Sequence, residues 1–154
     1  MRKLLTLLFM LAWLWPEAKA QTVTRSWDFD DPVVNRVADG WNISLYGNPN
    51  VDNGILKLTA VNQGGYCNIN FNAPAGQSIV DPSVSKRFII RIKNGTKDRI
   101  GSFLWKVDNE ENFRRMEILM TTEDTQFKEY VLDLTHDLRW TGNITNILMQ
   151  LMHD

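Results

Sequence analysis

The chain has 154 residues, with 17 lysines and arginines, 18 aspartates and glutamates, and a formal net charge of −1. It contains no basic stripe, so a nucleic-acid binder is excluded. Cys67 is the single cysteine, which excludes an intramolecular disulfide. Because Cys67 alternates with Asn68 and Asn70 and has no histidine or basic neighbour in sequence, we expect a small buried side chain rather than a reactive thiol.

The start of the chain differs from the rest. Two basic residues at positions 2 and 3 precede an apolar run, Leu4–Trp15, that is too short to span a bilayer comfortably. Ala18-Lys19-Ala20 then has the small-x-small pattern of a cleavage site. We therefore predict that residues 1–20 are a signal peptide, that the protein is secreted or periplasmic, and that residues 21–154 form one domain. The alternative is a retained membrane anchor.

Strand signals follow one another along this domain, with turn residues between them. They predict strands at residues 23–29, 41–45, 55–61, 66–71, 88–93, 100–107, 113–120, 127–134 and 144–152. Asn53-Gly54 is a strong hairpin signal, and the segments 47–53 and 72–86 are predicted to be loops. No segment has the apolar period of an amphipathic helix. The pattern predicts an all-β protein whose two antiparallel sheets pack as a β-sandwich.

The segment 127–134 has the clearest alternation. Leu132 and Leu134 share one side of this strand and Val131 lies on the other, so the leucines are expected to face the core. A turn then leads to Trp140, which we expect to cap the open end of the core.

Catalytic motifs are absent from the sequence. The histidines, His136 and His153, lie in a predicted turn and beside the terminus, and there is no G-x-S-x-G, H-E-x-x-H or Cys-His pattern. Glu117 differs from the turn carboxylates because it lies inside a strand, where it is either a site carboxylate or an ion-pair partner of Arg91 or Arg115. We expect no catalytic residue and a protein that is not an enzyme.

A polar sheet face is the candidate binding surface. Polar and apolar residues alternate in three predicted strands, which places the polar set on one side of each. If these strands share a sheet, their polar groups form one solvent-facing surface, although any antiparallel sheet with one wet side alternates in this way. Trp105 is a candidate aromatic platform for a ligand on this surface. Its parity with Phe103 gives the alternative that it is a core residue. The candidate ligand-binding residues are Tyr66, Asn68, Asn70, Arg91, Trp105, Arg115 and Glu117.

Several short motifs carry a resemblance. They are Glu129-Tyr130 followed by Asp133-Leu134, Trp140-x-Gly142-x-Ile144, the strand exit Ile90-x-Ile92-Lys93-Asn94-x-Thr96, the strand openings Trp27-Asp28-Phe29 and Gly40-Trp41, and Asn53-Gly54-Ile55-Leu56-Lys57-Leu58. Together they resemble the galactose-binding-like β-sandwich domains, the jelly rolls of secreted bacterial polysaccharide-utilisation proteins. The resemblance covers nearly all of the domain and implies a jelly-roll fold.

The resemblance also implies a non-catalytic module that binds a polysaccharide or oligosaccharide. Amide groups beside an aromatic platform suit a sugar, and the two arginines would bind hydroxyls or a uronate carboxylate. Such modules often hold a structural calcium between the first and last strands, where Asp28, Asp30 and Asp154 are candidates, but there is no D-x-D-x-D-G loop and we expect no cofactor.

As partners we expect a polysaccharide or oligosaccharide, no nucleic acid, no membrane span after cleavage, and no second subunit, so that the protein is a monomer. Two alternatives stay open. The chain is a small polysaccharide lyase or glycoside hydrolase that uses the same face, with Glu117, Arg115 and a tyrosine. Otherwise it is a cell-surface protein-interaction domain, which an exposed apolar patch would indicate.

Overall fold

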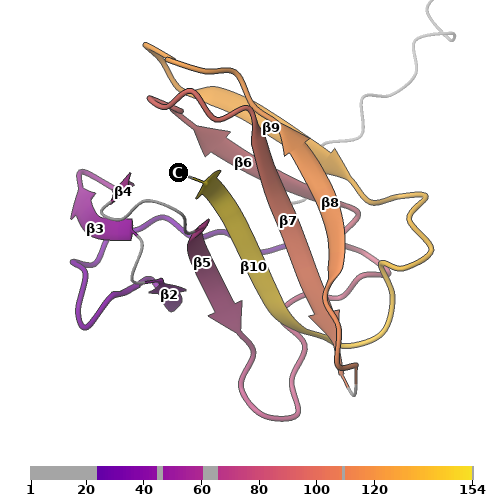
Figure 1. The fold of residues 1–154 in the computed structure, drawn as a ribbon. Coiled ribbons are helices and arrows are strands. Elements are labelled where there is room, and N and C mark those ends of the chain that lie inside the picture. The colour runs from indigo at the N-terminus through magenta and orange to yellow at the C-terminus, as the bar shows by residue number, and fades with distance from the viewer. Residues whose placement is uncertain (1–23, 45–46, 61–65, 109, 154) are drawn as a thin grey trace, which may run out of the picture.

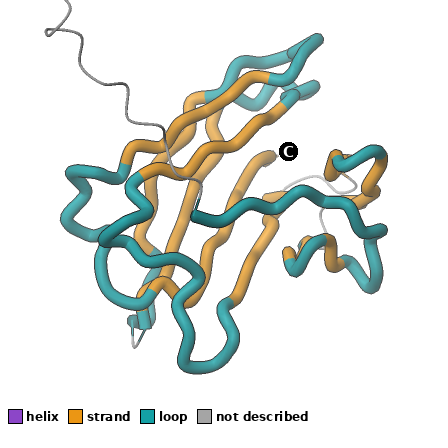
Figure 2. Tube along the Cα trace, turned by 180° about the vertical axis from the view of Figure 1, so that it is seen from behind, coloured by secondary structure: helices purple, strands orange, loops and turns teal. Residues whose placement is uncertain are grey.

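The computed structural model describes residues 24–44, 47–60, 66–108 and 110–153, so the predicted signal peptide lies outside the described residues. None of the described residues is helical (Figure 2), and no helix in this part of the chain is long and apolar enough to cross a bilayer. The structure is all-β. Its strands are β1 (Val37–Ala38), β2 (Trp41–Ile43), β3 (Gly47–Asp52), β4 (Ile55–Ala60), β5 (Tyr66–Asn72), β6 (Arg87–Ile92), β7 (Ile100–Val107), β8 (Arg114–Leu119), β9 (Lys128–Asp133) and β10 (Ile144–His153).

Six strands form the main sheet, in the order β1-β2-β5-β10-β7-β8 (Figure 1). β10 lies between β5 and β7 and pairs antiparallel with both. Its side chains Ile144, Ile147 and Met149 are fully buried, as expected for a strand that has a neighbour on each edge. The last described strand therefore completes the middle of the main sheet.

The other four strands form two small antiparallel sheets, β3–β4 and β6–β9. Asn53 and Gly54 join β3 to β4 with φ angles of 52° and 71°, which are the left-handed values that a two-residue hairpin needs. The prediction of a loop over residues 47–53 is wrong, because β3 pairs with β4 from Gly47 to Asp52. Pro49 is tolerated there because a two-stranded sheet leaves one edge of each strand without ladder hydrogen bonds.

The β6–β9 ribbon packs on one face of the main sheet through its apolar side chains. The ring of Phe88 in β6 lies 4.6 Å from that of Phe103 in β7, measured between centroids. Leu132 and Leu134 are buried whereas Val131 is 50% exposed, so the predicted alternation of β9 is confirmed. These contacts place a shared aromatic and aliphatic core against one face of the main sheet.

Trp140 and the segment before β1 close this core. Trp140 is buried, as predicted, and packs edge to face on Trp105 with centroids 5.5 Å apart. The predicted first strand, residues 23–29, is not a strand in its described part. Trp27 nevertheless contacts Trp41 at a centroid distance of 5.2 Å, and the Arg25 guanidinium stacks 4.7 Å from the ring centre of Phe71. Aromatic contacts therefore hold residues 24–29 against the core, although this segment is not part of a β-sheet.

Cys67 behaves as the sequence predicts. Its side chain is buried on the core side of β5, and burial raises the pKa of the thiol. Because the thiolate is the nucleophilic form, this position suits packing rather than chemistry.

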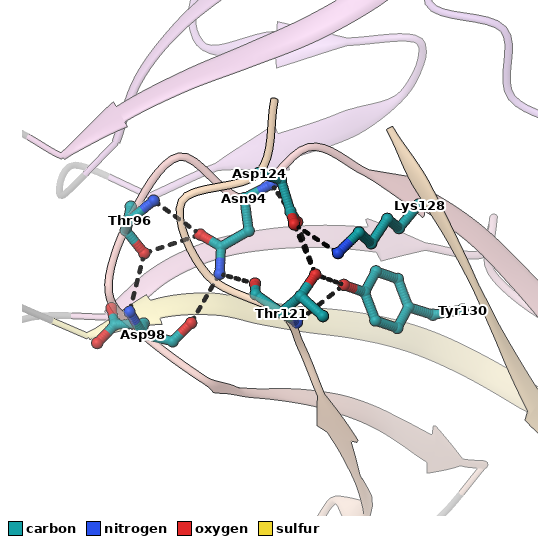
Figure 3. A network of polar contacts seen from close by, with 7 residues as sticks. All are labelled: Asn94, Thr96, Asp98, Thr121, Asp124, Lys128 and Tyr130. Carbon is teal, nitrogen blue, oxygen red and sulfur yellow. Dashed lines mark hydrogen bonds and ion pairs between the residues drawn. The ribbon is translucent and has the colours of Figure 1, made fainter. Parts of the chain in front are cut away.

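A polar network joins the loop after β6 to the loop after β8 (Figure 3). The Asn94 amide nitrogen donates to the carbonyls of Asp98 and Thr121 at 2.7 and 2.8 Å. Its oxygen accepts hydrogen bonds from the backbone and hydroxyl of Thr96. Asp124 accepts from the Thr121 hydroxyl at 2.7 Å, and both Asn94 and Asp124 are buried. Both polar atoms of the Asn94 side chain are thus hydrogen-bonded, and the bond to Thr121 joins the loop after β6 to the loop after β8.

The predicted all-β organisation with antiparallel pairing is confirmed. The described residues form a six-stranded sheet and two small sheets, and all the strand pairs that they contain are antiparallel.

Candidate functional site

The face of the main sheet that points away from the core is lined mainly by polar side chains. On β5 the residues Cys67, Ile69 and Phe71 are buried in the core, so Asn68 and Asn70 point to the opposite side. The same alternation applies to β7, β8 and β10. We call this surface the amide face, and it comprises Asn68, Asn70, Asn72, Ser102, Leu104, Lys106, Arg115, Glu117, Asn146, Leu148 and Gln150.

The strand register arranges the amide face in rows across the sheet. The first row is Asn72, Asn146 and Lys106; the second is Asn70, Leu148, Leu104 and Arg115; the third is Asn68, Gln150, Ser102 and Glu117. Side chains directly opposite one another in such rows have their Cβ atoms about 4.5–5.5 Å apart. A ligand lying across the strands would therefore meet amides on β5 and β10 and charged groups on β7 and β8.

The amide groups on this face have unused hydrogen-bonding capacity. The side-chain oxygens of Asn68, Asn70 and Asn146 are covered by neighbouring atoms, and they accept no hydrogen bond from the residues that the structure describes. The Asn146 amide nitrogen donates to the Asn72 side chain. Covered polar atoms are normally paired, so these three oxygens are uncommon, and a water or a ligand hydroxyl reaches them when the side chains turn toward the surface.

A cleft opens at the end of the amide face. It has a volume of about 640 Å³ and is lined by Lys106, Asn72 and Asn146 together with Phe113 and the segment Ala73–Gly76. Phe113 is 40% exposed just before β8, so an aromatic ring stands beside the first row of the face. The volume lies within the range of about 300–1,000 Å³ that is common for small-ligand sites.

A second cleft, of about 980 Å³, lies between the loop after β5 and the loop after β9. Several of its polar groups already form hydrogen bonds with one another or with the backbone. The backbone and hydroxyl of Ser83 both donate to Asp81 and lower the pKa of that carboxyl, while the Ser85 hydroxyl bonds to Thr24. The Trp140 indole donates to the Ser85 carbonyl at 2.6 Å. This cleft therefore offers fewer uncommitted groups to a ligand than the amide face.

The structure brings five of the predicted site residues to one side of the main sheet. Asn68 and Asn70 on β5 and Arg115 and Glu117 on β8 belong to the amide face, and Tyr66, which is 45% exposed, precedes Asn68 with the same parity. Arg115 Nη2 lies 3.5 Å from Glu117 Oε1, so these two side chains form an exposed ion pair along β8. Glu117 thus pairs with Arg115 and not with Arg91.

Arg91 does not belong to this surface, so its placement with the other six is wrong. It lies on β6 in the β6–β9 ribbon, opposite Glu129. Ile90 and Ile92 pack against the core, which sends the exposed Arg91 away from the main sheet. Its guanidinium lies 6.0 Å from the ring centre of Phe127 on the ribbon.

Trp105 is also excluded from the surface, because it is a core residue. Its exposed fraction is 0%, and its ring packs on Phe103 and Trp140. The indole nitrogen donates to the carbonyl of Arg139 at 3.2 Å, which satisfies its polar group inside the protein. Among the described residues, Tyr66 and Phe113 are the exposed rings beside the amide face that can serve as an aromatic platform.

Sequence reasoning missed seven residues of the amide face, and Lys106, Asn146 and Gln150 are the larger polar ones among them. Asn146 and Gln150 alternate with Ile147 and Met149, so the period that singled out Asn68 and Asn70 was also present in the last strand. Phe113 was predicted to begin the strand 113–120 and was not assigned to the binding surface, whereas in the structure it precedes β8.

Carboxylates that could hold a metal do not gather in the described part of the chain: no group of three or more His, Cys, Asp or Glu side chains there could hold a metal ion. Of the three calcium candidates, Asp154 lies outside the described residues, and the Asp28 backbone amide donates to Asp39 at 3.1 Å. Comparison of the sequence with protein-family models and with curated proteins finds no match.

Proposed function

We propose that the protein is an exported, non-catalytic carbohydrate-binding module that holds a polysaccharide or oligosaccharide along the amide face. The observation that carries the proposal is the set of amide side chains on β5 and β10, whose oxygens at Asn68, Asn70 and Asn146 are unpaired among the described residues. A sugar ring presents several hydroxyls that both donate and accept, and a planar amide matches both roles.

The rest of the face suits the other properties of a sugar. Phe113 stands at one end beside Lys106, and Tyr66 begins β5 at the other end, so each end offers an exposed ring for an apolar sugar face. Leu104 and Leu148 lie half-buried between the polar rows. Arg115 offers a planar guanidinium that can bind vicinal hydroxyls or a carboxylate with two hydrogen bonds.

A jelly-roll β-sandwich is the finer form of this fold that we propose. The packing of the β6–β9 ribbon on one face of the main sheet supports it, since the amide face is then the exposed side of the larger layer. Export through a signal peptide at residues 1–20 fits a ligand found outside the cytoplasm.

A lyase or hydrolase acting from the same face is the first alternative. Glu117 and Arg115 are its candidate working groups, but their side chains are 60% and 48% exposed and pair with each other. General acids usually need burial to shift their pKa toward the working pH, and glycosidases need two carboxylates at a defined spacing. The amide face contains Glu117 as its single carboxylate, which favours binding over cleavage.

A protein-interaction domain is the second alternative, and a different surface favours it. Ile89 and Val131 are cross-strand partners on the outer side of the β6–β9 ribbon, and they are 42% and 50% exposed. Exposed apolar pairs of this kind are common on protein surfaces, whereas an interaction site is normally a larger contiguous patch.

A glycan array probed with the purified protein tests the proposal. We expect binding to one family of glycans, with Asn70→Ala weakening it at least about tenfold, because an amide contributes paired hydrogen bonds. Asn50→Ala is the matched control, since Asn50 is an exposed asparagine on β3 outside the amide face. Absence of glycan binding, or equal weakening by both substitutions, would contradict the proposal. Release of shortened oligosaccharides would favour the enzymatic alternative.

A further inference from the structure

β8 is an edge strand of the main sheet, and one of its edges has no strand partner among the described residues. β7 covers one edge, and no other described strand pairs with β8. An uncovered edge presents a row of backbone N–H and C=O groups that can pair with another strand. Proteins often protect such edges with charged residues, so the arrangement of charge along β8 decides what this edge can bind.

The sequence of β8 is complementary to itself when it is reversed about Met116. Arg115 and Glu117 stand one residue to either side of Met116, and Phe113 and Leu119 stand three residues to either side. Leu119 is 75% exposed and Phe113 is 40% exposed, which is high for large apolar side chains. The segment 113–119 therefore has opposite charges near its middle and apolar groups at both ends.

We propose that the partner of this edge is a second copy of the same chain, which adds its own β8 antiparallel to the first. A two-fold axis at Met116 places Arg115 of each copy opposite Glu117 of the other. The same register places each Phe113 opposite Leu119 of the other copy. Opposite charges and aromatic-aliphatic pairs are the cross-strand combinations that stabilise antiparallel sheets, and a self-complementary patch is what a two-fold dimer requires.

The neighbouring registers are unfavourable, which makes the pairing specific. Moving the axis to Arg115 would place the two arginines opposite each other, and moving it to Glu117 would do the same for the two glutamates. Like charges directly opposite destabilise a strand pair. The free chain holds Arg115 and Glu117 within 3.5 Å of each other, so both charges are already positioned at the edge.

Such a dimer would join two amide faces. Residues directly opposite in paired strands lie on the same side of a sheet, so the amide faces of both copies continue into one surface. A monomer is expected from the sequence, and the free edge of β8 replaces that expectation. A six-residue strand pair buries little area, so the association belongs with weak complexes that form at high concentration.

Sedimentation velocity of the purified protein without any sugar tests the dimer. We expect a monomer at about 1 µM that shifts to a dimer toward about 1 mM, the range over which weak interfaces dissociate. The test is independent of the proposed function, because no glycan is present. A monomer over the whole concentration range would overturn the proposal, even if sugar binding is later found.

Charge reversals test the register. Arg115→Glu and Glu117→Arg each place like charges opposite one another, so each variant alone should dimerise at least about tenfold more weakly. An equimolar mixture of the two variants restores both opposite-charge pairs between unlike chains and should dimerise as the parent does. The double variant R115E/E117R should also dimerise, because it exchanges the charges symmetrically. Dimers of either single variant that are as stable as the parent would overturn the proposed register.

Discussion

The Asn94 backbone amide donates to the Asp124 carboxylate at 3.4 Å, and the Asp124 backbone amide donates to the Asn94 carbonyl at 2.8 Å. This reciprocal pair joins the exit of β6 to the loop that leads into β9. Because β6 and β9 form the ribbon that covers the core, the pair fixes the end of the ribbon at which Ile92 lies opposite Lys128. The stability of the fold should therefore depend on two polar residues that are not part of the amide face.

Asn94→Ala should destabilise the protein by about 2–4 kcal/mol, because it removes a buried amide that donates to the carbonyls of Asp98 and Thr121 and accepts two hydrogen bonds from Thr96. The measurement is urea unfolding followed by tryptophan fluorescence. Asn50→Ala is the control, and it should change the unfolding free energy by less than about 0.5 kcal/mol since Asn50 is exposed. Equal effects of the two substitutions would show that the network does not stabilise the loops.

The stability of the protein should also depend on Asp124 through pH. The hydrogen bond from Thr121, followed by that from Lys128, lowers the pKa of the Asp124 carboxyl below its ordinary value. A lowered pKa in the folded state stabilises the fold above the unfolded pKa of about 3.9, and this contribution is lost as pH falls through the folded pKa. Asp124→Asn should therefore destabilise the protein at neutral pH and make less difference in strong acid.

Urea midpoints of the parent and of Asp124→Asn, measured at about pH 7 and at about pH 2.5, check this dependence. The gap between the two proteins should narrow at the lower pH. A gap of the same size at both pH values would mean that the carboxylate charge does not contribute, and that only the shape of the side chain matters.

Trp105→Phe tests whether Trp105 stabilises the core or contributes to the binding surface. The substitution removes the hydrogen bond to the Arg139 carbonyl and part of the ring contact with Trp140, so it should cost about 1–3 kcal/mol of stability. Glycan affinity, measured at a temperature where the variant is fully folded, should stay at the parent value. A loss of affinity in the folded variant would return Trp105 to the binding site.

The sequence predicted individual strands better than it predicted which sheet each strand joins. Alternation in β5, β8 and β9 correctly identified which side chains face the core, because burial of one side imposes a period of two. Arg91 and Arg115 show the same alternation, yet they belong to different sheets, since a strand's period does not reveal its neighbours. β3 was missed because Gly47, Asn48 and Pro49 are poor strand formers, and its pairing with β4 overrides that preference.

Part of the amide face was predicted from the sequence. Asn68, Asn70 and Glu117 were found because each lies between apolar residues in a strand, and Arg115 because it shares the parity of Glu117. Trp105 was ambiguous because a large ring fits either side of a sheet, and only its contacts with Phe103 and Trp140 place it in the core. The cleft beside Phe113 depends on how the loop after β5 approaches β7, which no local pattern encodes.

The central claim is that ligand binding takes place on the amide face and not on the ribbon. Arg115→Ala and Arg91→Ala remove the same exposed group from the two opposite sides of the molecule, so they form a matched pair. Titration calorimetry with a glycan retained on the array should show at least about tenfold weaker binding for Arg115→Ala, because a charged bidentate contact is lost, and unchanged binding for Arg91→Ala. Parent affinity for Arg115→Ala together with weakened binding for Arg91→Ala would contradict the account.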